Sequence, residues 1–131
     1  MIVVDASAVL EVLLRTSAAT AVENRLFGGS PSLHAPHLLD VETAQVIRRY
    51  AANAEIDAER GRAALADLAD FPLRRYPHDF LLPRIWDLRN NLTAYDAAYV
   101  ALAEALPAVL VTCDGKLARS HGHHARVELL T

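Results

Sequence analysis

Several kinds of residue are scarce in this sequence, and each scarcity excludes a class of protein. The single cysteine, Cys113, excludes an internal disulfide and a metal site built from cysteines alone. No apolar run approaches the ~20 residues of a membrane-spanning helix, so we expect no membrane association. The first residues contain no basic leader and already carry an acid at position 5, which predicts a protein that is not secreted and works in the cytoplasm.

Positive charge is scarce as well. There is one lysine among the 13 basic residues, and the formal net charge is −3 at pH 7. This charge argues against a protein that simply coats DNA or RNA, because such proteins carry an excess of positive charge. The hydrophobic fraction of 53% and the charged fraction of 22% are typical of a folded protein. With 131 residues and neither repeats nor a linker, we expect one domain over residues 1–131.

Short apolar strands alternate with helical segments along the chain. Residues 2–4 are a β-branched run that leads directly into a helical segment, with Ser7 as the expected helix cap. A strand that feeds a helix opens a parallel α/β unit, so the alternation predicts a three-layer α/β/α fold around a parallel sheet of short strands. We expect further strands at 32–35, 73–76, 108–112 and 127–130, and helices at 18–27, 37–50, 57–70, 78–89 and 92–106.

Four acidic residues occupy unusual positions. Asp5 and Asp114 each follow an apolar strand. Asp96 falls on the inward stripe of its helix, and Glu42 lies among apolar neighbours in another helix. Each one alone has an ordinary explanation, as a helix cap, a first-turn acid or a glutamate that reaches the solvent. Together they are unusual, because burying an unpaired carboxylate is expensive.

A parallel sheet can bring these four acids together. The carboxyl ends of its strands meet at one edge, and Asp5 and Asp114 are adjacent there if the first and fourth strands pair. Asp96 and Glu42 lie in the first turns of helices beside that edge and can converge on the same place. Four carboxylates repel one another and need a counter-charge. Oxygen ligands of this kind select Mg²⁺ or Mn²⁺ over zinc, and a metal site ringed by acids typically serves phosphate chemistry.

The sequence around the four acids resembles a known family. Four segments follow one another over essentially the whole chain: IVVDASA at 2–8, ETAQVIRR at 42–49, LTAYDAAYVALA at 92–103 and VTCDGKLA at 111–118. Together they are similar to the PIN domain, and more narrowly to the VapC-type toxins of bacterial toxin–antitoxin modules. Each motif alone is a weak signal, whereas four in register, with matching helices between them, are a strong one.

The resemblance implies a Mg²⁺- or Mn²⁺-dependent endoribonuclease that cuts single-stranded or looped RNA. Such a protein is held inactive by a cognate antitoxin and commonly forms a homodimer. The family's acids map onto Asp5, Glu42, Asp96 and Asp114, and its supporting hydroxyls onto Ser7, Thr93 and Thr112. In this assignment the three aspartates ligate the metal, while the glutamate is a further ligand or orients the attacking water. Lys116 and Arg119 are candidates for contacts with an RNA phosphate.

Other residues have simpler interpretations. The histidines of the loop at 121–124 lack the spacing of a metal site and are expected in solvent. We expect Trp86 and Tyr99 in the core or at a dimer surface. The helices at 18–26 and 38–47 are candidates for binding an antitoxin helix or a second subunit, with an antitoxin arginine entering the acidic pocket.

Three other functions stay open at this point. A phospho-acceptor receiver domain also has strand-end acids, but it needs paired acids after its first strand, where this chain has only Asp5. A catalytically silent PIN-like module that binds proteins has no need to keep four repulsive acids. A DNA nuclease uses the same chemistry as a ribonuclease, so the sequence does not separate these two substrates.

Overall fold

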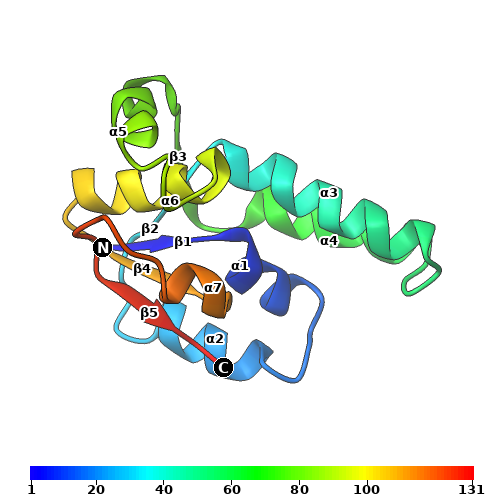
Figure 1. The fold of residues 1–131 in the computed structure, drawn as a ribbon. Helices are drawn as coiled ribbons and strands as arrows, with labels where there is room; N and C mark the ends of the chain where they lie inside the picture. Colours follow the sequence, from blue (N-terminus) through cyan, green and yellow to red (C-terminus); the bar gives the residue numbers. More distant parts are fainter.

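Five short parallel strands form one sheet at the centre of the computed structural model, which describes residues 1–131 (Figure 1). Their order across the sheet is β3-β2-β1-β4-β5. The strands are β1 (Ile2–Val4), β2 (Leu33–Pro36), β3 (Leu73–Tyr76), β4 (Val109–Thr112) and β5 (Val127–Leu129). β1 and β4 are paired in parallel, with Val4 opposite Val111. The residues that follow these two strands therefore meet at the same edge of the sheet.

Helices flank the sheet on both faces. They are α1 (Ala6–Leu13), α2 (Ala19–Phe27), α3 (Leu38–Ala52), α4 (Ala58–Asp70), α5 (Leu82–Asp87), α6 (Ala94–Ala105) and α7 (Gly115–Ala118). In Figure 1, α6 covers one face with α5 above it, and α1, α2 and α7 lie on the other face. α3 and α4 pair as an arm that begins after β2 and extends beyond the sheet. The predicted fold class, helices around a short-stranded parallel sheet, is confirmed.

The core is most complete between the sheet and α6. All of β1 is buried, because helices cover both faces of this central strand. Every residue of α6 from Ala97 to Ala103 is buried as well. The inward stripe predicted for this helix is buried at Tyr99, Val100 and Ala103, and the opposite side is buried as well. α5 covers the side of α6 that faces away from the sheet, so both sides are apolar (Figure 1).

The helix predicted at 78–89 is two shorter pieces. A 3-10 turn, η1 (Asp79–Leu81), comes directly before α5, and Pro83 lies in the first turn of α5. Proline lacks a backbone N–H and its ring collides with the preceding turn of a continuous helix. It is therefore accepted only where a new helix begins, which separates α5 from η1.

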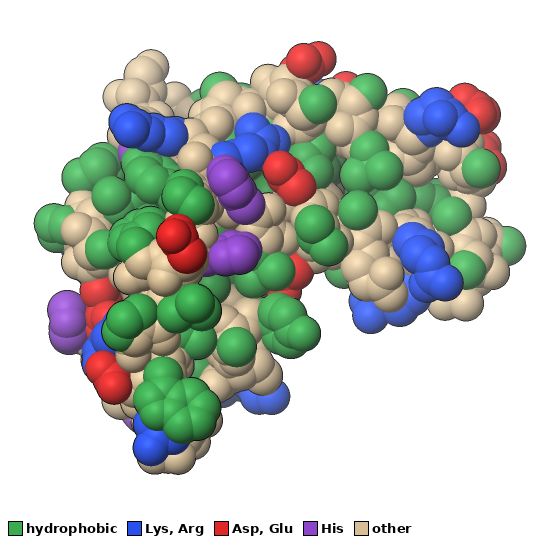
Figure 2. Space-filling view, turned by 90° about the horizontal axis from the view of Figure 1, so that it is seen from above, with side chains coloured by type: hydrophobic (Ala, Val, Ile, Leu, Met, Phe, Trp, Pro, Cys, Tyr) green, Lys and Arg blue, Asp and Glu red, His purple; other side chains and the backbone are tan.

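An apolar patch over η1 and α5 is open to solvent. Phe80, Leu82 and Trp86 are 53%, 57% and 66% exposed, so Trp86 is not a core residue. Figure 2 shows hydrophobic side chains gathered at the end of the molecule that carries α5, and Lys and Arg side chains spread over the arm. None of the helices has the length and apolarity needed to cross a membrane.

Candidate functional site

Asp5 lies at the centre of a hydrogen-bond network at the carboxyl end of β1. Its Oδ1 accepts from Ala8 N at 3.2 Å and from Ser7 Oγ at 2.7 Å, so Asp5 is the cap of α1. The sequence predicts Ser7 as this cap, and that prediction is wrong. Asp5 is the extended residue just before the helix, whereas Ser7 lies inside its first turn. The strand-end acid is therefore held in place by the helix that follows it.

Thr112 links Asp5 to Asp114 across neighbouring strands. Its Oγ1 donates to Asp5 Oδ2 at 2.5 Å and accepts from Asp114 N at 3.0 Å. Ser7 Oγ in turn accepts from Cys113 N at 2.9 Å. The Asp5 carboxylate, which is buried, thus receives two hydroxyl donors and one backbone N–H. Such bonds fix the orientation of the carboxylate and stabilise its charged form.

Glu42 is held by Tyr99, which the sequence places in the core or at a dimer surface. Tyr99 is buried in α6, and its hydroxyl donates to Glu42 Oε1 at 2.5 Å. Glu42 itself is half-buried and borders the apolar stripe of α3. The sequence does contain a signal for this contact. Tyr99 follows Asp96 by three residues on the same helix face, and a buried tyrosine hydroxyl needs a hydrogen-bond partner.

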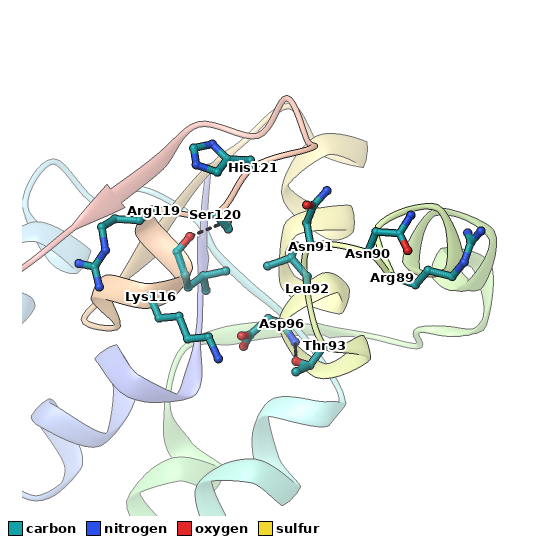
Figure 3. Close-up of a pocket in the computed structure, with 11 residues that line it drawn as sticks. Arg89, Asn90, Asn91, Leu92, Thr93, Asp96, Lys116, Arg119, Ser120 and His121 are labelled. Atoms are coloured by element: carbon teal, nitrogen blue, oxygen red, sulfur yellow. Dashed lines mark hydrogen bonds between the residues drawn. The ribbon is translucent and has the colours of Figure 1, made fainter.

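Asp96 and Asp114 both lie at helix starts. Thr93 caps α6, where its Oγ1 accepts from Asp96 N at 3.2 Å, so it supports the backbone of Asp96 rather than its carboxylate. Asp114 caps α7, where its Oδ1 accepts from Lys116 N at 2.9 Å. The side chains of Asp96 and Lys116 point toward each other (Figure 3). Lys116 therefore brings a positive charge to the edge that holds the acids.

Burial and mutual repulsion raise the pKa of three of the four acids. For Asp5, burial outweighs the hydrogen bonds that the carboxylate accepts, and Asp114 raises the pKa further. For Glu42, burial is again the largest cause, opposed by the tyrosine hydroxyl, and the charges of Asp96 and Asp5 raise its pKa. For Asp96, burial and Asp114 raise the pKa against the attraction of Lys116. The four carboxylates thus interact electrostatically and form one cluster of negative charge.

The donors of this cluster fit a hard divalent cation. All four are carboxylates, which Mg²⁺ and Mn²⁺ prefer, and added positive charge relieves their repulsion. The structure contains no group of three or more histidine, cysteine, aspartate or glutamate side chains arranged to hold a metal ion. Asp5 and Asp114 use their carboxylates to cap α1 and α7. The donor chemistry therefore fits such an ion, whereas the side chains do not form a finished coordination sphere.

The structure also places two other predicted binding features, Arg119 and the apolar face of α2. Arg119 points to the far side of α7, where its guanidinium lies over Gly115 (Figure 3). The apolar face of α2, a predicted docking surface, is buried in the protein's own core through Ala19, Val22 and Leu26. That face is therefore not available to a partner.

The histidine loop differs in part from its prediction. His121 and His124 are exposed, and the latter pairs with Glu104. His123 is half-buried, and its Nε2 lies 2.9 Å from Ser120 Oγ. This histidine therefore helps to shape the loop after α7.

Comparison with known proteins finds relatives along the whole chain. The family model described as the PIN domain matches residues 2–121. Ribonuclease VapC12 of Mycobacterium tuberculosis is 44% identical over 130 residues, which are 99% of each chain. Ribonuclease VapC9 of the same organism is 48% identical over 117 residues, which are 89% of this chain and 88% of that one. The crystal structure of VapBC2 from Rickettsia felis, bound to a DNA fragment from their promoter, is 14% identical and aligns over 100% of both chains with a TM-score of 0.71. As the four sequence segments predict, the chain belongs to the PIN-domain family and, within it, to the VapC ribonuclease toxins of toxin–antitoxin systems.

Proposed function

We propose that the four-carboxylate cluster is the active site of a Mg²⁺- or Mn²⁺-dependent endoribonuclease that cuts single-stranded or looped RNA. One observation carries the proposal. Asp5, Glu42, Asp96 and Asp114 come from separate segments to one edge of the sheet, and repulsion contributes to the raised pKa of three of them. Clustered acids with perturbed pKa values are typical of functional sites. The family supports RNA as the substrate.

The acids have separate proposed roles. Asp5, Asp96 and Asp114 hold the ion, and Glu42 is a further ligand or orients the attacking water. When bound, such an ion supplies positive charge to the scissile phosphate and acidifies water. Because Tyr99 occupies only Oε1 of Glu42, the second carboxylate oxygen stays free to accept a proton from water.

The hydroxyl groups around Asp5 have a positioning role, because they orient its carboxylate. Ser7 and Thr112 donate to its two carboxylate oxygens and so fix the angle at which Asp5 presents its charge. Residues of this kind, which orient ligands without touching the ion, typically change metal affinity or activity about 10- to 100-fold when they are replaced. Thr93 contributes by starting α6 at the residue that places Asp96 on the edge.

Cleavage of a mixed pool of structured RNAs tests the proposed activity. The purified chain, Asp96→Asn and the matched control Asp67→Asn, an exposed acid on α4, are each incubated with Mg²⁺, Mn²⁺ or EDTA. We expect cuts that require the metal, disappear in Asp96→Asn and persist in Asp67→Asn. Intact RNA under every condition, with folded and partner-free protein, would instead favour a silent protein-binding module. A DNA pool treated in parallel separates the two nuclease substrates.

We also propose a docking site for the cognate antitoxin. An apolar groove between α1 and α3 is lined by Leu10, Leu38, Val41 and Tyr95 and borders Glu42. This arrangement suits an amphipathic antitoxin segment whose arginine reaches the acids, because the groove ends at negative charge. The segment at 38–47 thus stays a docking candidate, although α2 does not.

Inhibition by the antitoxin tests this groove. Val41 is 69% exposed, so Val41→Glu should leave the fold intact, retain cleavage and weaken inhibition. Leu65→Glu, on the exposed side of α4, is the matched control and should be inhibited like the unmodified chain. Cleavage that persists at a saturating ratio of antitoxin would contradict an inhibitory partner altogether.

The apolar patch over η1 and α5 is our proposed contact between two copies of the chain. Phe80, Leu82 and Trp86 together expose aromatic and aliphatic surface, which monomeric proteins usually limit. Light scattering should report a dimer for the unmodified chain and a monomer for Trp86→Ser. A dimer in both would place the contact elsewhere.

A further inference from the structure

A polar cavity of about 530 Å³ opens directly beside Asp96. One wall is the loop at 89–93 between α5 and α6, and the other is α7 with its following loop, at 116–121 (Figure 3). Only two of its eleven lining residues, Leu92 and Leu117, are hydrophobic. Its volume lies in the range of small-ligand sites, about 300–1,000 Å³. The cavity is therefore a second compartment joined to the acid cluster.

Lys116 lines this cavity and carries a positive charge close to Asp96. Its side chain is exposed, takes part in no salt bridge and points toward Asp96 (Figure 3). Two arginines also line the cavity, and both turn their guanidinium groups away from Asp96. Arg89 stacks on the ring of Trp86 and donates to its carbonyl, and Arg119 points to the far side of α7. Lys116 is therefore the cation of this lining that lies nearest the acids.

Asn91 supplies a free amide on the opposite wall. The neighbouring hydroxyls are already used, since Thr93 caps α6 and Ser120 is bonded within its own loop. The Asn91 side chain rests on the backbone of Gly122, where a Cβ atom would sit 2.1 Å from Asn91 Nδ2. Gly122 has a φ of +89°, so its lack of a side chain permits both the turn and this close approach. The amide carries two N–H donors and one acceptor oxygen, and none of them is used in a hydrogen bond within the protein.

We propose that this cavity is a nucleotide subsite, which takes the nucleotide beside the scissile phosphate of a single-stranded RNA and discriminates its base. Lys116 contacts a phosphate, the base lies against Leu92, and the Asn91 amide bonds to the base edge. The proposal rests on the ribonuclease function proposed above. It adds a determinant of where the RNA is cut.

The distribution of groups favours a nucleotide over a simple anion. A free anion is best held by several cations or backbone donors on more than one side. Here the lysine lies at one end and the Asn91 amide at the other, the two lining arginines turn away from Asp96, and Leu92 adds an apolar surface. Phosphate contacts position a nucleic acid, and contacts to base edges provide specificity. In single-stranded RNA the bases are unstacked, so their edges are open to such a side chain.

Nucleotide titrations test the subsite without relying on cleavage. The full-length Asp5→Asn chain is titrated with AMP, GMP, CMP, UMP and ribose 5-phosphate, and its backbone amide signals are followed by NMR. We expect shifts at 90–93 and 116–121, with affinities for the best and worst base that differ about tenfold, as one good side-chain contact provides. Ribose 5-phosphate should shift only signals near Lys116. Shifts elsewhere, or equal affinities for all four bases, would overturn the proposal.

Variants separate the phosphate contact from the base contact. Lys116→Ala should weaken all five ligands alike, whereas Arg62→Ala, a highly exposed arginine on α4, should change none. Asn91→Ala should abolish the difference between bases without affecting ribose 5-phosphate. Asn91→Asp keeps the shape against Gly122 but loses both N–H donors, so the preferred base should change. A base preference that both Asn91 variants retain would overturn the assignment.

Cut sites in a randomised RNA provide the second test. Asn91→Ala should lose base preference at one position near the cut, and Asn24→Ala, an exposed amide on α2, should keep it. Lys116→Ala should lower binding of every sequence and reduce the slope of log affinity against log salt by about 0.7. If the unmodified chain cuts but Asn91→Ala leaves the pattern unchanged, the subsite is wrong and the ribonuclease proposal stands. If the unmodified chain cuts nothing, the ribonuclease proposal fails and the subsite proposal fails with it.

Discussion

Replacing Thr112 by valine should destabilise the protein much more than the same replacement at Thr43. Both side chains are fully buried, and valine has nearly the same volume as threonine, so neither change opens a cavity. Thr112 donates to Asp5 and accepts from Asp114 N, whereas the hydroxyl of Thr43 has no hydrogen-bond partner. The two variants therefore separate hydrogen bonding from packing.

The expected magnitude follows from these contacts. A hydrogen bond to a charged group contributes about 1.5–3 kcal/mol, and a neutral one about 0.5–1.5 kcal/mol. Thr112→Val should therefore lower the free energy of unfolding by about 2–4 kcal/mol. Thr43→Val removes a buried hydroxyl that lacks a partner, so it should be neutral or stabilise the protein by about 1 kcal/mol.

Urea unfolding at neutral pH measures both variants. With a slope of about 1–3 kcal/mol per molar urea, Thr112→Val should move the midpoint down by about 1–2 M at an unchanged slope. Equal shifts for the two variants, or a Thr112→Val protein as stable as the unmodified chain, would refute the reasoning. Ser7→Ala combined with Thr112→Val should be non-additive, because both hydroxyls donate to Asp5.

Three further outcomes are expected. Tyr99→Phe removes the donor that holds Glu42, so cleavage at limiting metal should fall about 10- to 100-fold, measured as rate against metal concentration. Gly122→Ala should lower the free energy of unfolding by about 1 kcal/mol in urea titrations, because φ is positive and the new Cβ meets Asn91. For Glu104, burial raises the pKa, but hydrogen bonds from an arginine and a backbone N–H outweigh it, and the pKa is lowered. Its stabilising contribution is thus present above the unfolded pKa and lost as pH falls through the folded pKa. Glu104→Gln should cost about 1–2 kcal/mol at neutral pH and nothing in strong acid, as unfolding across pH would show.

Much of the candidate site could be predicted from local sequence. Asp5 and Asp114 directly follow apolar strands, and a parallel sheet places the residues after its strands along one edge. Asp96 comes three residues after its helix cap Thr93, which is also a local pattern. The fold class and the family are visible for the same reason, since the alternation of strands and helices and the four motifs are properties of consecutive residues.

Only the tertiary structure decided which distant segments touch. The sequence indicates that the Tyr99 hydroxyl needs a partner, but not that this partner is Glu42, 57 residues earlier. The pattern of α6 shows an apolar face but not that α5 covers its other side, and the pattern of α2 does not show that its apolar face belongs to the core. The cavity between Lys116 and Asn91 exists only because two loops meet. Residue periodicity identifies the apolar face of a helix, whereas the neighbour that covers this face depends on how all helices are placed over the sheet.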